Sequence, residues 1–481
     1  MSAPTRAGAD VHAHPETCGP ADAAVTLARF VTRSFAAPRT RRVATARLLD
    51  TVGAIAAGAS VAESRLLVDL CDGHAGREDL LWRARLCCAL ARCSEVDDID
   101  LRTCVTPGSV AVGVALALAE RRECTGAQLL DAICAGYEAM VAVGAAVGGA
   151  WSLYAGSWPS YLAAPVAGAA TAARMLGLGP ATVAEALSIA AARATGHGAG
   201  AAVAPTARWM LYGSAAADGL LASLAARAGL RGDPSALGAL CHQRAGRRAP
   251  PVAGRRAPAG AASPSTGSEP AQEDEPAVTR AQLKPFCTAR QTQAAVQAAI
   301  AAAAELGSPD AESIAAVEVA VPHAYRSMID RPEPRGRVDS IVSAQFQVAA
   351  ALSDERILLD VAREAPKLPA AGAALMARIR VLADELLDQL YPALWPARVR
   401  IVARDGRQAV RVAGDGRGAE GSTGGIQADL DATDLDAVEV KHRRLGALGA
   451  GLGRATVLCR EVAGARAAPA AELLELALKP L

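Results

Sequence analysis

Apolar positions in the first half of the chain follow the spacing of helices that pack on several sides. From about residue 25 to residue 232, Ala, Leu and Arg dominate, and Gly or Pro separates one segment from the next. The segments ARLLDTVGAIAAG, LLWRARLCCALARC and PATVAEALSIAAARATG have the small-residue faces of closely packed helices. Thr125 and Gln128 have the spacing of a capping box at the start of another helix. The short loops between these segments predict antiparallel neighbours in a bundle.

The pattern breaks at residues 244–279, which are rich in Pro, Gly, Ser and charge. Such a stretch cannot bury enough apolar surface to offset the entropy that is lost on ordering. We therefore expect a disordered insertion, whose simplest role is that of a linker. Residues 1–24 lack an apolar core as well, and we expect a flexible N-terminus.

Beyond the insertion, strand patterns appear among helical ones. The segment AVEVAVP, Ala316 to Pro322, alternates as a half-buried strand does. The segment from Ala397 to Gly414 predicts a hairpin that turns at Asp405 and Gly406. Helical windows such as ARQTQAAVQAAIAAAAELG surround the strands, and the chain returns to helix from about residue 429. The second half therefore predicts a small α+β domain followed by a helical tail.

Composition adds limits on partners and location. The 481 residues include 50 Lys and Arg against 49 Asp and Glu, so a net charge of +1 gives no electrostatic argument for nucleic-acid binding. The N-terminus lacks a secretory signal, and no run of about 18 apolar residues stands out as a membrane span. The 11 cysteines are scattered without a CxxC pair. We expect a cytoplasmic protein with reduced thiols, no membrane contact and no metal site.

One short stretch concentrates charge between two apolar helical segments. CSEVDDIDLRTCVTPGS, Cys93 to Ser109, holds four carboxylates, one arginine and two threonines at positions 103 and 106. If Asp97, Asp98 and Asp100 share a pocket, repulsion and desolvation raise at least one pKa toward that of a general base. From the residues alone, a solvated turn is the favoured interpretation, because charge runs usually lie at the surface.

Three other candidates have plain alternatives. Arg208 and Lys284 stand at the edges of apolar helical segments, where they either solvate a helix end or hold an anion in a dry cleft. The segment GHGAG, residues 196–200, lacks the strand and the GK[ST] of a phosphate loop, so it is better explained as a helix end. His197 within it is more simply a loop residue than a base.

The order of these segments resembles the MmgE/PrpD family, which includes 2-methylcitrate dehydratase, cis-aconitate decarboxylase and an iminodisuccinate epimerase. Eight segments carry the resemblance, among them ARLLDTVGAIAAG, EVDDIDLRTCVTPGSVAVGVALALAE, LKPFCTARQTQAAVQAA and YPALWPARVRI. The resemblance implies a mainly α fold: an all-helical domain of residues 25–243 and 429–481 and an inserted α+β lid of residues 280–428. It also implies a site in the cleft between them, no cofactor, and a homodimer.

The positions that matter for catalysis in the family are only partly kept here. Where the family has D-F-D-D-T followed by T-H-P-G, this chain has Glu95 for the first aspartate, Ile99 for the threonine and Thr106 for the histidine, and it keeps Asp97 and Asp98. Three further family histidines correspond to Trp158, Leu211 and Ala289. Arg208 stands for a lysine, Phe346 for a tyrosine, and Lys284 is unchanged.

These replacements leave two hypotheses. In the first, the cleft has a new substrate and the chain is a cofactor-free lyase or isomerase. Asp98 or Glu95 moves the proton, with Asp97 as a further catalytic candidate, and Lys284 and Arg208 hold a carboxylate or enolate. Elimination, isomerisation, epimerisation or cyclisation of a small carboxylate- or carbonyl-bearing molecule would fit. The residues expected to bind substrate are Arg208, Trp158, Thr106, Tyr161, Tyr212 and Phe346.

In the second hypothesis the chain is a non-catalytic paralogue that binds a ligand or a partner. The kept charges at Arg208 and Lys284 favour the enzyme, because charge in a cleft costs desolvation unless it binds something. The loss of histidines predicts a poor 2-methylcitrate dehydratase. The Ala- and Arg-rich composition suggests a high-GC bacterium and a role in specialised metabolism.

Overall fold

The structure is a computed structural model that describes residues 22–74, 76, 78–194, 206–245, 275–414 and 434–479. Several predictions fall on other residues. Most of the flexible N-terminus, the GHGAG segment with His197, residues 246–274 of the expected insertion and the glycine-rich residues 415–425 lie outside the described residues.

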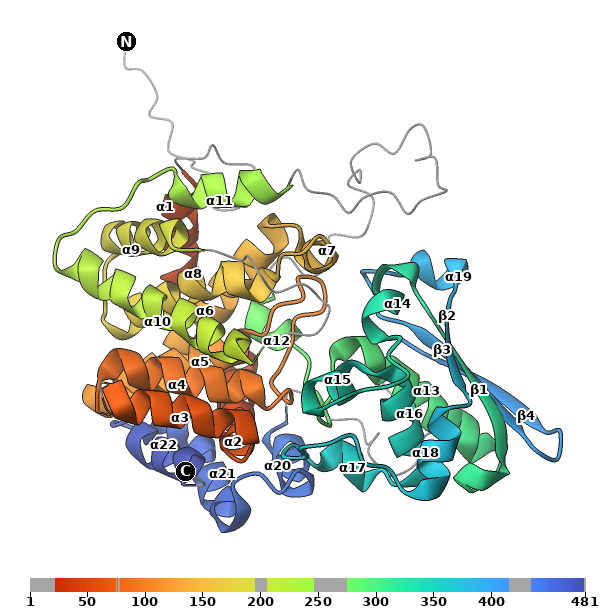
Figure 1. Ribbon diagram of the computed structural model, residues 1–481. Helices are drawn as coiled ribbons and strands as arrows, with labels where there is room; N and C mark the ends of the chain where they lie inside the picture. The colour runs from red at the N-terminus through yellow and green to blue at the C-terminus, as the bar shows by residue number, and fades with distance from the viewer. Residues whose placement is uncertain are drawn as a thin grey trace, which may run out of the picture.

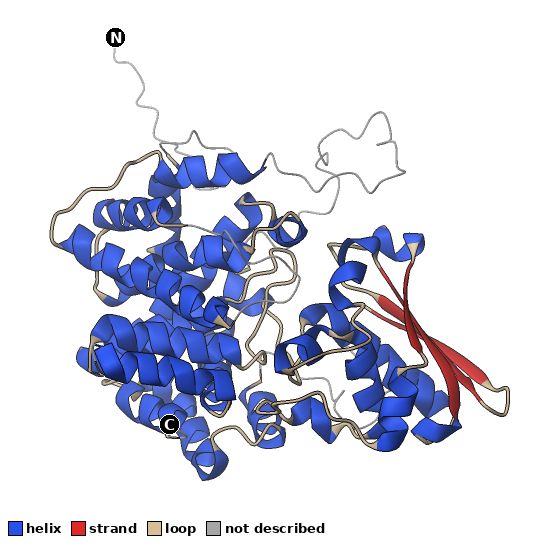
Figure 2. Cartoon of the chain, in the orientation of Figure 1, coloured by secondary structure: helices blue, strands red, loops and turns tan. Residues whose placement is uncertain are grey.

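A body of helices makes up the larger part of the molecule (Figures 1 and 2). Its N-terminal helices are α1 (Ala23–Val31), α2 (Pro38–Ala59), α3 (Ala62–His74), α4 (Leu80–Cys93), α5 (Pro107–Arg121), α6 (Gly126–Ala146), α7 (Gly149–Tyr154), α8 (Pro159–Met175), α9 (Pro180–Ala192), α10 (Ala207–Arg227), α11 (Ala236–Ala245) and α12 (Ala277–Arg280). The predicted capping box is present: the Thr125 amide donates to Gln128 Oε1 at 2.8 Å, and the Gln128 amide donates to Thr125 Oγ1 at 3.2 Å.

The C-terminal segment returns to this body. It forms α20 (Leu435–Arg444), η3 (Gly449–Gly451), α21 (Leu452–Glu461), η4 (Val462–Gly464) and α22 (Ala470–Leu478). All three α-helices pack on α2, and α22 also packs on α5. A buried ion pair holds the contact, with Lys441 Nζ at 2.5 Å from Asp50 Oδ1. Both ends of the chain therefore contribute to one helical core.

The smaller part is an α+β unit around a four-stranded sheet. Its strands are β1 (Ile314–Val321), β2 (Ile379–Ala383), β3 (Ala397–Ala403) and β4 (Gln408–Ala413), in the order β2-β1-β3-β4. The β1–β2 pair is parallel and the other two pairs are antiparallel. The predicted hairpin is confirmed, with Gly406 at a φ of 87° in its turn. The predicted strand Ala316–Pro322 begins two residues after the start of β1 and ends one residue after its end.

Helices lie against one face of this sheet, between the strands and the helical body (Figure 2). The helical elements of the unit are α13 (Arg290–Glu305), η2 (Ala311–Ser313), α14 (His323–Ile329), α15 (Arg337–Val342), α16 (Ala344–Ser353), α17 (Arg356–Leu359), α18 (Ala370–Met376) and, at the outer end of the sheet, α19 (Glu385–Asp388). Exposed Val410 and Val412 show that β4 has a solvent-facing side. The expected fold class, mainly α with a small α+β domain, is confirmed.

Glycines allow the helices of the body to approach closely. A Cβ atom at Gly168 in α8 would lie 2.3 Å from the carbonyl oxygen of Ala216 in α10, and one at Gly219 would lie 2.0 Å from the carbonyl oxygen of Pro165. Among the described residues, α6 is long and apolar enough to cross a membrane, but 78% of its most apolar window is buried inside the protein. Core helices of globular proteins meet the same criterion.

Candidate functional site

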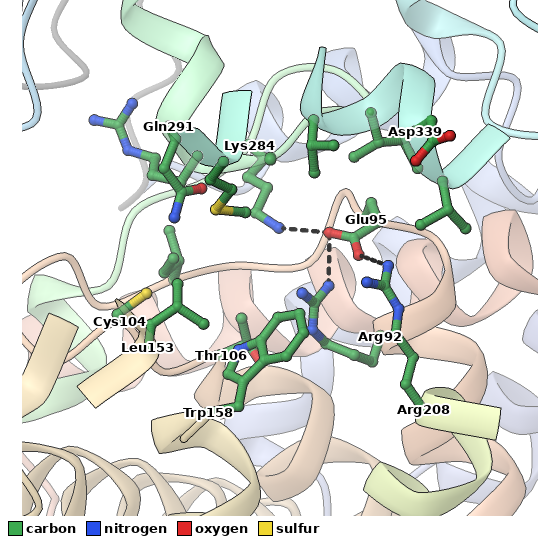
Figure 3. A pocket seen from close by; sticks show the side chains of 17 residues that line it. Arg92, Glu95, Cys104, Thr106, Leu153, Trp158, Arg208, Lys284, Gln291 and Asp339 are labelled. Carbon is green, nitrogen blue, oxygen red and sulfur yellow. Dashed lines mark hydrogen bonds and ion pairs between the residues drawn. The ribbon is translucent and has the colours of Figure 1, made fainter. Parts of the chain in front are cut away.

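A cavity of about 50 Å³ lies between the helical body and the α+β unit (Figure 3). The body contributes the side chains of Arg92, Glu95, Ile99, Cys104, Thr106, Leu153, Trp158 and Arg208. Lys284 comes from the segment between α12 and α13. The α+β unit contributes Ala289, Arg290, Gln291, Met328, Val338, Asp339, Ile341 and Val342. Residues far apart in the sequence therefore meet at one site.

The acidic stretch forms the loop between the end of α4 and the start of α5, and it is buried. Glu95, Asp97, Asp98 and Asp100 expose 3%, 1%, 1% and 2% of their surface. The solvated turn that the residues alone favoured is therefore wrong. Asp100 Oδ1 accepts hydrogen bonds from the backbone and the hydroxyl of Thr103, at 3.0 and 2.7 Å, and so closes the turn.

Neighbouring elements hold the backbone of this loop. Ile99 forms a two-way backbone pair with Gln282, with N···O distances of 2.9 and 2.8 Å. Arg337 of α15 donates to the carbonyl oxygens of Cys93 and Ser94 at 2.8 and 3.3 Å. The α+β unit is thus bonded directly to the loop that carries the acidic side chains.

Five buried charged groups form one network at the cavity. The carboxylate of Glu95 contacts Arg92 at 2.8 Å, Arg208 at 3.0 Å and Lys284 at 3.6 Å. Asp97 contacts Arg92 and Lys284, both at 3.2 Å. Figure 3 shows Glu95 directed at the three cations. The structure therefore brings together four of the predicted residues and adds Arg92.

The two carboxyl groups differ in proton affinity. Burial would raise the pKa of Glu95, but Arg92, Lys284 and Arg208 outweigh it and lower that pKa to about 2. Burial raises the pKa of Asp97 above its ordinary value, although Arg92 and Lys284 oppose the change. Glu95 is hence a fixed anion near neutral pH, and Asp97 is the carboxyl group that takes up a proton more readily.

The guanidinium groups also respond to burial. Burial lowers the pKa of Arg208 to about 10, with Glu95 opposing the change. The Nε atom of Arg208 is buried and makes no hydrogen bond to the described residues. An unsatisfied buried donor costs about 1–3 kcal/mol, so a ligand oxygen there would be favourable.

Two tryptophan rings make cation–π contacts with the guanidinium groups at the cavity. The ring of Trp158 lies 5.6 Å from the Arg92 guanidinium carbon and 5.5 Å from that of Arg208. Trp209 lies closer to Arg208, at 3.7 Å, and sequence reasoning missed this contact. Cation–π contacts of this kind stabilise buried guanidinium groups without neutralising them.

Of the four aromatic residues expected to bind substrate, only Trp158 lines the cavity. Trp158 lines the cavity, whereas Tyr161 and Tyr212 form a second layer of rings, with centroid distances of 5.7 Å from Trp158 to Tyr161 and 5.6 Å from Tyr161 to Tyr212. The Tyr212 hydroxyl bonds that of Thr106, a cavity residue, at 3.1 Å. Phe346 is buried in a separate cluster with Phe286 and does not line the cavity.

Asp98, which was predicted as a proton-moving group, lies outside the cavity lining. Its carboxylate accepts hydrogen bonds from the Tyr137 hydroxyl at 2.6 Å and from the Gly108 amide in the first turn of α5 at 2.9 Å. Arg47 lies 3.8 Å away. These contacts turn Asp98 toward the core, where it caps a helix N-terminus.

Sequence reasoning missed Arg92, although a signal was present. Arg92 stands in the last turn of α4, three residues before Glu95, a spacing that allows an ion pair. The lining residues of α14 and α15 carried no such signal, because only the tertiary fold brings Met328, Val338, Asp339, Ile341 and Val342 to this loop.

Comparison with protein-family models gives two matches that agree with the two parts of the fold. The MmgE/PrpD N-terminal domain matches residues 25–240, and the MmgE/PrpD C-terminal domain matches residues 286–419. The chain belongs to the MmgE/PrpD family. Membership places this MmgE/PrpD protein among dehydratase-like, lyase-type enzymes. No curated protein matches the chain.

The structure shows which of the positions that hold histidine in the family's pattern lie at the cavity. In this MmgE/PrpD protein, Thr106, Trp158 and Ala289 line the cavity, whereas Leu211 is 50% exposed and does not. The described residues contain no group of three or more His, Cys, Asp or Glu side chains that could hold a metal ion. The side chains that line the cavity offer amine, guanidinium, carboxyl, hydroxyl, thiol and amide groups.

Proposed function

We propose that the protein is a lyase or isomerase that moves a proton next to a carboxylate or carbonyl group of a small molecule, without a cofactor. Elimination, isomerisation, epimerisation and cyclisation all include such a step. The observation that carries the proposal is Lys284, which lines the cavity while only 2% exposed and contacts Asp97 at 3.2 Å. We also propose a cytoplasmic homodimer that acts in bacterial specialised metabolism.

Some of the charged groups at the cavity are suited to bind the substrate, and others are suited to transfer its proton. The free Nε donor of Arg208 and the Arg92 guanidinium suit a substrate carboxylate or carbonyl oxygen. Lys284 Nζ first gives a proton to the Asp97 carboxylate, whose pKa burial raises. The neutral amine then takes the proton from the carbon next to the carbonyl group, and the electron pair of that C–H bond moves to the carbonyl oxygen, where Arg92 and Arg208 stabilise the enolate.

The same geometry argues against ordinary 2-methylcitrate dehydration. The lining residues of the described cavity include no histidine, and three positions that hold histidine in the family's pattern hold Thr106, Trp158 and Ala289 here. Loss of one positioned acid or base typically costs about a hundredfold to ten-thousandfold in rate. Several are absent together, so a different substrate accounts better for the cations that remain.

A non-catalytic, ligand-binding role is the second candidate. The closed ion-pair network favours it, because Glu95 satisfies three cations even without a ligand. Such a scaffold would bind small carboxylates in the cavity but would not exchange their protons. The two candidates therefore differ in one measurable step.

The test is proton exchange in heavy water. Wild-type protein is incubated in D₂O with a panel of small carboxylic and oxo acids, and deuterium on the carbon next to the carbonyl group is followed by NMR. Lys284→Met keeps the side-chain length and removes the amine, and we expect at least about a hundredfold slower exchange. Lys367→Met, on the exposed surface, is the matched control and should exchange as the wild type does.

The outcomes separate the candidates. Exchange that Lys284→Met abolishes and Lys367→Met retains would support the enzyme. Binding of a panel acid without exchange would support the scaffold. Ordinary turnover of 2-methylcitrate would contradict the proposal that the cavity takes a different substrate.

A further inference from the structure

The carboxylate of Glu95 lies among the cations that would also attract an anionic ligand to the cavity. One of its oxygens lies 3.0 Å from Arg208 Nη2, and the other lies 2.8 Å from Arg92 Nη1 and 3.6 Å from Lys284 Nζ. Both oxygens are thus engaged by cations from three separate segments of the chain (Figure 3). Guanidinium and ammonium groups hold a bound carboxylate in the same way.

The backbone holds Glu95 in this position at a conformational cost. Its φ is +59°, in the left-handed region that side chains other than glycine rarely adopt. Lys441 Nζ donates to the carbonyl oxygen of Val96 at 2.6 Å, and Arg337 donates to that of Ser94 at 3.3 Å. Bonds on both sides of Glu95 therefore fix the strained residue with its side chain in the cavity.

Glu95 also sets the charge that the cavity offers to a ligand. Arg92, Arg208 and Lys284 bring three positive charges, and Glu95 and Asp97 bring two negative ones. The network is left with one net positive charge when both carboxyl groups are ionised. Arg290 and Asp339, which also line the cavity, have opposite signs and leave this balance unchanged. One negative charge on a ligand would neutralise the network.

The remaining wall of the cavity is apolar. Ile99 and Leu153 line it from the helical body, and Met328, Val338, Ile341 and Val342 line it from the α+β unit. A second or third carboxylate of a ligand would lie against these side chains or against Glu95. Desolvation opposes the first position and like-charge repulsion opposes the second.

We propose that Glu95 is a specificity-determining residue: its carboxylate offsets one of the three positive charges at the cavity, and the single net positive charge that remains limits the substrate to one carboxylate on an apolar body. The proposal deepens the proposed function, on which it rests for the role of the cavity. Glu95 selects by charge and moves no proton itself. Polycarboxylates are excluded, and small apolar monocarboxylates are accepted.

Calorimetric titration of Glu95 variants tests the proposal. The probes are butanoate, pentanedioate and propane-1,2,3-tricarboxylate. Glu95→Gln keeps the shape of the side chain and removes its charge, and Glu95→Asp keeps the charge as the matched control. We expect Glu95→Gln to bind the tricarboxylate at least about tenfold more tightly than the wild type does, because one like charge at contact distance is gone. Butanoate affinity should change less than about threefold, and Glu95→Asp should keep the wild-type order of affinities.

Loss of Glu95 leaves buried cations unpaired, so folding is checked in the same samples. Thermal unfolding of Glu95→Gln with and without the tricarboxylate gives a second readout, and we expect a larger upward shift of Tm than in the wild type. Equal tricarboxylate affinity in the two proteins would overturn the proposal. If the wild type binds butanoate and Glu95→Gln gains nothing, the specificity role fails while the proposed function stands. A gain in Glu95→Gln without butanoate binding or proton exchange in the wild type would support the role of Glu95 and contradict the proposed function.

Discussion

Asp98 accepts hydrogen bonds from Tyr137 and Gly108 in the interior, where burial raises its pKa from the ordinary value of 3.8 to about 6. Arg47 and these hydrogen bonds oppose the change without cancelling it. The folded protein therefore holds the Asp98 proton more tightly than the unfolded chain does. The residue affects stability in a defined pH range and takes no part in the cavity.

Asp98→Asn should remove a pH dependence of stability. In the wild type, the unfolded chain ionises first as the pH rises from about 4 to about 6, so the Asp98 contribution to the free energy of unfolding falls, by an amount on the order of 3 kcal/mol. Above this range the contribution stays constant. Urea unfolding at pH values from 4.5 to 7.5 measures the free energy of unfolding of both proteins, and the wild type should lose stability relative to Asp98→Asn as the pH rises. Parallel curves for the two proteins would contradict this account.

At the scale of single residues, the sequence indicated which side chains lie close together better than it indicated which way each of them points. Lys284, Glu95, Asp97 and Arg208 do form one ion-pair network, and all of them except Asp97 line the cavity. Their roles depend on which way each side chain points, and this direction is set by contacts such as the Tyr137–Asp98 hydrogen bond, between residues 39 positions apart. A local pattern has no information on such contacts.

At the scale of elements, α8 and α10 pack closely against each other next to the cavity. Both helices also supply cavity groups at their N-terminal ends, Trp158 and Arg208. Gly168 in α8 and Gly219 in α10 permit this contact, because backbone carbonyl oxygens of the facing helix leave no space for a Cβ atom at either position. Bulkier residues there would separate the helices and the cavity groups they carry.

Gly168→Ala tests this packing. The new methyl group would overlap the Ala216 carbonyl oxygen, 2.3 Å away, and we expect a loss of about 1–3 kcal/mol in the free energy of unfolding. Gly73→Ala in α3 is the matched control, because no atom lies within 4 Å of the added group. It should be neutral or stabilising by up to about 1 kcal/mol. Equal urea midpoints for the two variants would show that the α8–α10 contact adapts freely.

Secondary structure was the most predictable level of the fold. Apolar periodicity, the Thr125–Gln128 capping box and the Asp405–Gly406 turn are local signals, and each corresponds to the observed element. The pairing of β1 with β2 was not predictable, because about 60 residues with several short helices separate the two strands. Parallel pairing across such a distance leaves no local pattern.

At the scale of the whole molecule, the cavity exists because three parts of the chain converge on the acidic loop. The helical body supplies the loop itself, α15 bonds its carbonyl oxygens through Arg337, and α20 bonds the Val96 carbonyl oxygen through Lys441. The arrangement of helices, α+β unit and helical tail followed from the sequence and from the family resemblance. The convergence on one loop required the structure.

A crystal structure of the protein with butanoate tests the central claim most directly. The claim is that the cavity between the two parts of the fold binds the carboxylate of the substrate next to Lys284. We predict density for the ligand inside the cavity, with a carboxylate oxygen within about 3.2 Å of Lys284 Nζ or the Arg208 guanidinium. Butanoate bound elsewhere at saturation, with the cavity empty, would contradict the account.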